Sequence, residues 1–219
     1  MGHLEVLYNV FAYLKKHKDM GKLAYDLKTP EVDESAFNNN AHWKDFYGDL
    51  EEELPPNMPE PRGNVVRISA FVNANHAGNV FTCRSHSGII IFVQNASIIC
   101  FSKRQNTVEA ETFGSDFVAL RICKELIVAL RYKLRMFWVP LDIPADVFCD
   151  NHGVVINASK QEYTLHKKHT AINYHTVCKV AAAGILRVVN EDGEADLVDL
   201  LTKVLTGQRR WDLCHFLMW

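Results

Sequence analysis

The sequence has no run of the roughly 18 apolar residues that a membrane-spanning helix needs. Its start lacks the basic segment and long apolar core of a secretory signal. It also lacks a strong net charge, with 24 Lys and Arg against 26 Asp and Glu, which excludes a histone-like basic binder. Hydrophobic residues make up 48% of the 219 residues, as in an ordinary globular protein. We therefore expect a folded protein of the cytoplasm or nucleus that is not secreted.

Closely spaced cysteines are also missing. No two of the 6 cysteines are closer than 17 residues, so neither a Cys-x-x-Cys motif nor zinc-knuckle spacing occurs. We expect reduced thiols that are mostly buried.

Charge is unevenly distributed along the chain. Residues 1–63 carry 7 Lys and Arg against 12 Asp and Glu, a net −5, whereas residues 64–219 carry 17 against 14, a net +3. Attraction to a polyanion therefore belongs to the C-terminal part.

Composition divides the chain into four segments. Residues 1–28 predict a helix, from apolar residues at helical spacing over 3–18, and a short strand over 23–27. Residues 29–63 are acidic and rich in proline, which is typical of a linker. Residues 64–205 predict the main domain, and residues 206–219 a C-terminal tail.

The main domain predicts a mixed α/β sheet. The three runs at its start are rich in β-branched and aromatic residues, and the short segment 94–96 favours a hairpin between the last two. The expected elements are strands over 65–72, 88–93 and 97–102, a helix over 109–136, a strand over 145–149, a helix ending at 182, a strand over 185–189 and a helix over 195–203. This order, β-β-β-α-β-α-β-α, predicts a five-stranded sheet with helices on both faces.

Three carboxylates mark a candidate site. Asp150 directly follows the predicted buried strand 145–149, and open α/β sheets place their sites at such strand ends. Asp116 and Asp199 lie beside the apolar faces of predicted helices, where a carboxylate needs a partner. Each residue alone also fits a helix cap or a solvated side chain. Together they are the oxygen ligands that suit Mg²⁺, and the Cys and His spacings do not suit zinc.

From about Val65 to Leu205 the chain resembles the ribonuclease H domain that ends the Ty1/copia-type retrotransposon polyprotein. The matching segments, which follow the family's order and spacing, are 73–79, 84–89, 102–108, 114–120, 149–151, 168–169 with 174–175, and 197–203. Residues 3–27 resemble the tail of the reverse transcriptase that precedes this domain. No Tyr-x-Asp-Asp motif of a polymerase occurs.

The resemblance implies a ribonuclease H-like fold and hydrolysis of the RNA strand of RNA/DNA hybrids by two Mg²⁺ ions, with Mn²⁺ as a substitute. Four carboxylates hold the ions in that family, and the corresponding residues here are Asn73, Asp116, Asp150 and Asp199. Asn73 replaces the first carboxylate and Asp116 replaces a glutamate. Asn75 and Val204 also depart from the pattern. We expect impaired catalysis, because a neutral amide bridges two dications poorly.

Basic residues predict a nucleic-acid surface. Arg84, Lys103, Arg104, Lys167 and Lys168 are candidates for phosphate contacts, with a solvated surface as the alternative. Two functions stay open: a ribonuclease H-like domain with a degenerate metal site, and a non-catalytic nucleic-acid-binding or scaffold module of the same fold. The expected partners are an RNA/DNA hybrid or another nucleic acid and a polymerase domain from another chain.

Overall fold

A computed structural model describes residues 8, 11, 12, 15, 16, 33–37, 43–159, 168–191, 193 and 196–217. The predicted helix 3–18 lies outside the described residues except for the isolated positions 8, 11, 12, 15 and 16. The predicted strand 23–27, Lys167 and the side chain of Lys168 also lie outside them. No helix of the described part has the length and apolar character that a bilayer span requires.

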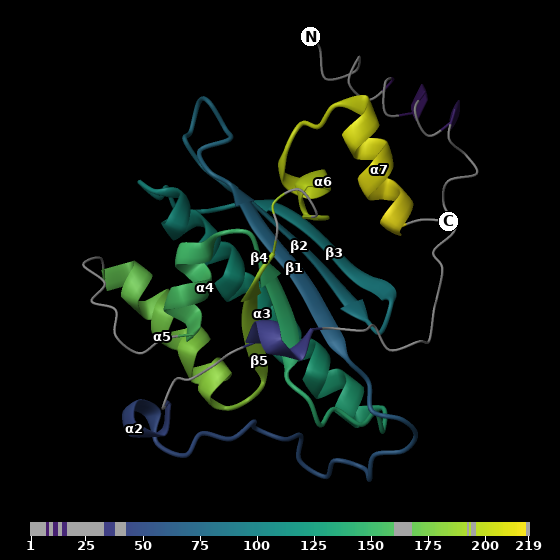
Figure 1. Ribbon diagram of the computed structural model, residues 1–219, viewed down its shortest axis with the longest axis vertical. Helices are drawn as coiled ribbons and strands as arrows, with labels where there is room; N and C mark the ends of the chain where they lie inside the picture. Colours follow the sequence, from purple (N-terminus) through teal and green to yellow (C-terminus); the bar gives the residue numbers. More distant parts are fainter. Residues whose placement is uncertain are drawn as a thin grey trace.

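Five strands form one sheet in the order β3-β2-β1-β4-β5 (Figure 1). The strands are β1 Ile68–Asn75, β2 His86–Val93, β3 Ala96–Arg104, β4 Ala145–Cys149 and β5 Leu186–Asn190. The first three form an antiparallel meander, whereas β4 runs parallel to both β1 and β5. This mixed sheet confirms the predicted α/β class and ribonuclease H-like architecture.

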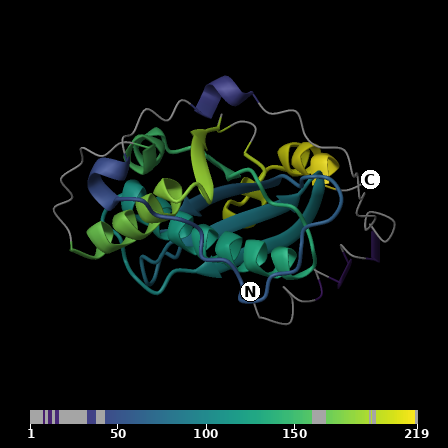
Figure 2. The same ribbon diagram turned by 90° about the horizontal axis from the view of Figure 1, so that it is seen from below.

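Helices cover both faces of the sheet (Figure 2). The helices are α2 Trp43–Tyr47, α3 Thr112–Met136, α4 His152–Ser159, α5 Lys168–Ala182, α6 Asp199–Thr202 and α7 Gly207–Leu217, with a 3-10 turn, η1, at Glu34–Phe37. Helices α3 and α5 lie on one face, and α6 and α7 lie on the other. The predicted helices on both faces are therefore confirmed.

The alternation of side chains along β2 explains how both faces are packed. Ile89 and Ile91 join the core beneath α3. Gly88, on the opposite face, lies against α6, because a Cβ atom at this position would come within 2.5 Å of both Val198 and Thr202. The glycine lets α6 approach the sheet directly opposite Asn73, its partner in the β1–β2 register. It thereby helps to position Asp199.

Segments before the sheet also contact it. Glu34 binds Arg67 and Arg187, which both bind the buried Asp146 of β4. Glu52 binds Arg131 of α3, and Tyr47 shares a hydrogen bond with His175 of α5. These described parts of the predicted linker pack on the sheet domain. The boundaries predicted at residues 28, 63 and 205 stay predictions.

Three helical features differ from the sequence-based expectations. The predicted helix 195–203 is only the four-residue α6, because Asp196–Val198 form a turn before it. Helix α4, which the sequence-based element order did not include, begins directly after Asp150 and Asn151, and the Asn151 side chain caps its first turn. The predicted C-terminal tail contains α7. The long helix predicted over 109–136 is confirmed as α3.

Candidate functional site

Four elements bring polar side chains to one edge of the sheet. Asn73 lies near the end of β1, Asp150 directly follows β4, Asp116 lies in the second turn of α3, and Asp199 begins α6. Asn73, Asp116 and Asp150 line a pocket of about 570 Å³ at this edge, and a hydrogen bond from Asn73 links Asp199 to it. The four residues that the sequence singled out therefore converge.

The Asn73 amide is the centre of this cluster. Its Nδ2 donates to Asp196 Oδ2 at 2.6 Å, to Asp150 Oδ2 at 3.1 Å and to Asp199 Oδ1 at 3.3 Å. The NH₂ group has only two hydrogens for these three acceptors. Asn73 is 3% exposed, so the interactions are shielded from water. The amide thus presents its donor end, not its oxygen, to the carboxylates.

Asp116 is held by two other donors. Its Oδ1 accepts from the Ala74 backbone N–H at 3.0 Å, and its Oδ2 accepts from Asn151 Nδ2 at 2.7 Å. The helical carboxylate is therefore fixed between β1 and the start of α4. This arrangement leaves Asp116 beside the Asn73 cluster and not bonded to Asn73 itself.

Two cations neutralise Asp199. Lys203 Nζ lies 2.6 Å from Asp199 Oδ1, and Arg209 Nη2 lies 3.4 Å from Asp199 Oδ2. Burial opposes the charged form of Lys203, but its contact with Asp199 and the nearby Asp150 raise the pKa of the ammonium group. Lys203 also lines the pocket. The site therefore contains a built-in positive charge.

Sequence reasoning missed Asp196, Asn151, Lys203 and Arg209 as members of the site. Asp196 is 3% exposed, and it also accepts a hydrogen bond from the Val198 N–H before α6. Its spacing of three residues from Asp199 was the available signal, since such residues share a helical face. With Asp196, three carboxylates accept from the Asn73 amide, and Asp116 lies beside them.

Burial shifts the acid–base equilibria of the cluster. It raises the pKa of Asp116 to about 7, helped by the neighbouring Asp150 charge and opposed by the hydrogen bonds from Asn151 and Ala74. Burial also raises the pKa of Asp196 to about 6, against the hydrogen bond from Asn73. Burial also raises the pKa of Asp150. Burial therefore favours the protonated form of these three carboxyl groups.

We expect the metal-free protein to lose stability as the pH rises from 5 to 7.5. A carboxyl group with a raised folded-state pKa stabilises the fold fully below its unfolded pKa, and this contribution is lost as the pH rises through the folded value. For Asp116 and Asp196 the loss falls between about pH 4 and 7. Urea unfolding in EDTA should show a fall on the order of 2 kcal/mol. Asp116→Asn should flatten the dependence, and equal slopes in both proteins would contradict the account.

The side chains of this site, as they are arranged, do not fit a pair of divalent metal ions. Within the described residues, no three Asp, Glu, His or Cys side chains are arranged to hold one metal ion. Three of the carboxylates instead bind the Asn73 amide, and Asp199 also binds Lys203 and Arg209. An N–H donor and an ammonium group repel a cation, so this arrangement favours hydrogen-bond partners over Mg²⁺.

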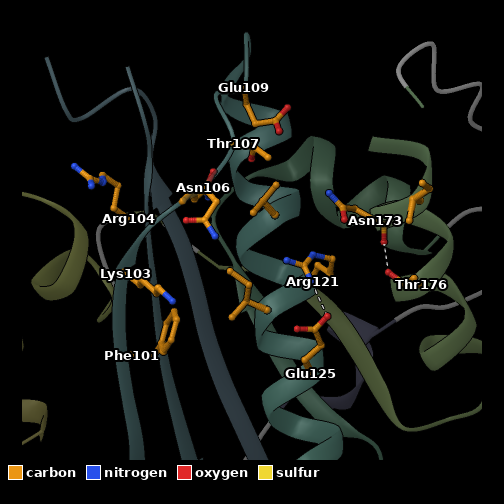
Figure 3. Close-up of a pocket in the computed structure, with 14 residues that line it drawn as sticks. Phe101, Lys103, Arg104, Asn106, Thr107, Glu109, Arg121, Glu125, Asn173 and Thr176 are labelled. Atoms are coloured by element: carbon orange, nitrogen blue, oxygen red, sulfur yellow. Dashed lines mark hydrogen bonds and ion pairs between the residues drawn. The ribbon is translucent and has the colours of Figure 1, made fainter. Parts of the chain in front are cut away.

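The predicted basic residues lie at the same end of the sheet. Arg84 belongs to the β1–β2 loop, and Lys103 and Arg104 end β3. In the β2–β3 register, Arg104 pairs with His86, the first residue of β2. Lys103 and Arg104 extend to opposite sides of β3 (Figure 3). No described residue tests Lys167, and Lys168 is described only as the start of α5.

A second cavity separates β3 from the helices. It has a volume of about 550 Å³ and lies between β3, α3 and α5 (Figure 3). Lys103, Arg104 and Arg121 line it, together with the amides of Asn106 and Asn173. Arg121 is paired with Glu125 on α3. Glu109 and Glu125 also line the cavity, so Lys103 and Arg104 at the end of β3 carry the positive charge that no described carboxylate pairs with.

Comparisons with known proteins reveal relatives among retroelements. No family model matches the chain. The chain is 26% identical over 145 residues to the retrovirus-related Pol polyprotein from transposon RE2 of Arabidopsis thaliana, a match covering 66% of this chain and 10% of the relative. It is 22% identical over 152 residues to that of transposon TNT 1-94 of Nicotiana tabacum, covering 69% of this chain and 11% of the relative. The chain thus spans about a tenth of the length of these relatives.

The chain is also similar to solved structures. The structure of LC11-RNase H1 in complex with RNA/DNA hybrid is 15% identical, with a TM-score of 0.49, and the match covers 62% of this chain and 94% of that chain. The similarity to Pol polyproteins confirms the resemblance to a retrotransposon ribonuclease H domain. The Ty1/copia type stays a prediction.

Proposed function

We propose that this chain is a retrotransposon-derived ribonuclease H-like domain that binds RNA/DNA hybrids and has impaired hydrolysis of the RNA strand. Asn73 carries this proposal. Its neutral amide takes the place where the family has a carboxylate, and its N–H groups face three carboxylates. If losing this carboxylate weakens transition-state stabilisation by about 3–5 kcal/mol, the rate falls roughly 10²- to 10⁴-fold.

The remaining residues support a retained binding role. Asp116, Asp150 and Asp199 keep their positions around the pocket, while Lys103 and Arg104 are exposed at the same end of the sheet. Cationic side chains track phosphates without reading sequence. The same observations favour the second candidate, a non-catalytic nucleic-acid-binding or scaffold module. Because the native residues do not fit a pair of divalent ions, we propose that Mg²⁺, or Mn²⁺ in its place, is bound only once a carboxylate replaces Asn73.

A cleavage assay tests the impairment. The full chain is incubated with an RNA/DNA hybrid labelled on the RNA strand, in Mg²⁺ and separately in Mn²⁺. We expect little or no cleavage above that of the Asp150→Ala protein. Robust cleavage that Asp150→Ala abolishes would refute the impairment and show a working nuclease.

Hybrid binding should weaken steeply with salt. The double variant Lys103→Ala with Arg104→Ala should bind less tightly, and the slope of log K against log salt should fall by about 2, because each lost phosphate contact removes about one unit. Fluorescence anisotropy with a labelled hybrid measures both quantities. Lys133→Ala is the control, since this exposed lysine lies near the far end of α3. An unchanged slope in the double variant would remove Lys103 and Arg104 from the interface.

A further inference from the structure

The loop between β1 and β2, residues 76–85, exposes two bulky apolar side chains at its tip. Val80 is 87% exposed and Phe81 is 97% exposed. Single exposed apolar residues are common on protein surfaces. Here, two adjacent ones belong to a loop that extends from the sheet edge carrying the candidate site (Figure 1). This position favours a contact role for the loop tip.

Hydrogen bonds fix the shape of this loop. Asn79 Oδ1 accepts from the backbone N–H groups of Phe81 and Thr82, at 3.2 and 2.9 Å. The Cys83 N–H donates to the Asn79 carbonyl at 2.8 Å, and the Asn79 N–H donates to the Arg84 carbonyl at 3.2 Å. A loop held in this way loses little entropy when its tip is bound. Phe81 is therefore presented in a preorganised position.

The surroundings of the loop indicate the chemistry of its partner. Asn75 and His76, where β1 leads into the loop, line the carboxylate pocket. Residues 76–86 include no acidic residue, and Arg84 lies within them. At the other end of the loop, His86 pairs with the exposed Arg104 across β2 and β3. An exposed aromatic ring in a loop that carries Arg84 and leads to the His86–Arg104 strand pair matches a nucleic acid strand, which offers base faces and phosphates together.

We propose that Phe81 stacks on an unpaired or unstacked base of nucleic acid bound at this edge. The inference rests on the proposed nucleic-acid binding and assigns a specific contact to it. Every base has a π-face, so the contact tolerates any sequence. Because the contact needs an unpaired or unstacked base, we expect tighter binding of a hybrid with a single-stranded flank than of a fully paired hybrid. Loss of such a contact weakens binding roughly 5- to 150-fold.

The test compares variants of the full chain by fluorescence anisotropy, using a hybrid with a single-stranded overhang and a blunt hybrid over a range of salt concentrations. Phe81→Ala should weaken overhang binding roughly 5- to 150-fold, with an unchanged salt slope, because no charge is removed. Phe81→Trp should bind the overhang hybrid as tightly as the wild-type protein, and the overhang should quench the fluorescence of the introduced indole. Phe137→Ala is the matched control, since Phe137 is 71% exposed at the far end of α3.

The outcomes separate this inference from the proposed function. Wild-type affinity in the Phe81→Ala protein would overturn the stacking contact and leave hybrid binding intact. A Phe81 effect on self-association alone would overturn it in favour of a protein partner. Absence of hybrid binding by the wild-type protein would overturn both the contact and the proposed function.

Discussion

The Asn73→Asp protein is expected to cleave the RNA strand of a hybrid roughly 10²- to 10⁴-fold faster than the wild-type protein. The substitution exchanges an amide NH₂ group for a carboxylate among Asp150, Asp196 and Asp199. Like charges at about 3 Å separation disfavour the metal-free state, so a divalent ion that neutralises them should bind more tightly. The variant should therefore also be less stable in EDTA and regain stability with Mn²⁺.

Two further variants separate geometry from charge. Asn75→Asp adds the same charge two residues further along β1, where the native Asn75 side chain donates to the Thr202 carbonyl. It should not raise the cleavage rate, because Asn75 lines the pocket but its side chain bonds to the Thr202 carbonyl and not to the carboxylates around Asn73. Adding Asp150→Ala to Asn73→Asp should remove the gained activity. If Asn73→Asp stays as inactive as the wild-type protein, loss of the first carboxylate does not explain the impairment.

Arg131→Ala is expected to lower the free energy of unfolding by about 3–5 kcal/mol. The Arg131 side chain is 3% exposed, and it forms a two-pronged pair with Glu52 through bonds of 2.8 Å. It also donates to the Ile143 and Leu141 carbonyls. Removing the guanidinium group leaves the Glu52 charge with Arg135 alone and reduces the donors available to these carbonyls. Urea denaturation at pH 7 measures the loss.

Arg121→Ala is the matched control for that measurement. Arg121 also pairs with a glutamate, Glu125, but as neighbours on the exposed surface of α3. Such pairs contribute about 0–1 kcal/mol. A loss as small as this in Arg131→Ala would mean that the segment around Glu52 does not stabilise the sheet domain.

The sequence predicted those parts of the fold that rest on strong local patterns. The strands were found from their β-branched residues, and the 25-residue helix α3 from its apolar periodicity. Such patterns are present because one face of each element must be apolar to be buried. Helix α4 was missed, since His152 and Gly153 at its start are typical of a turn. The length of the last predicted helix was wrong because the Asp196 side chain binds the Val198 N–H, forming a turn before α6.

The site was predictable in some of its members, but Asp196, Asn151, Lys203 and Arg209 were missed, and so were the contacts. Asp116, Asp150 and Asp199 stood out because carboxylates beside apolar residues or at strand ends need partners. The i,i+4 spacing of Asp199 and Lys203 in the predicted helix was an available signal for their ion pair. No pattern in the sequence specified that the Asn73 amide donates to Asp196, or that Arg209 reaches Asp199. The first of these contacts joins segments more than 100 residues apart, and the second joins α7 to the start of α6. They emerge only from the packing of α6 on the sheet.

The most direct test of this account is a crystal of the wild-type protein soaked in Mn²⁺, with anomalous scattering recorded. We expect no anomalous peak among Asn73, Asp116, Asp150 and Asp199, and a clear peak there in Asn73→Asp crystals soaked in the same way. A strong peak beside these side chains in the wild-type crystal would show that the amide leaves the metal site intact, which contradicts the account.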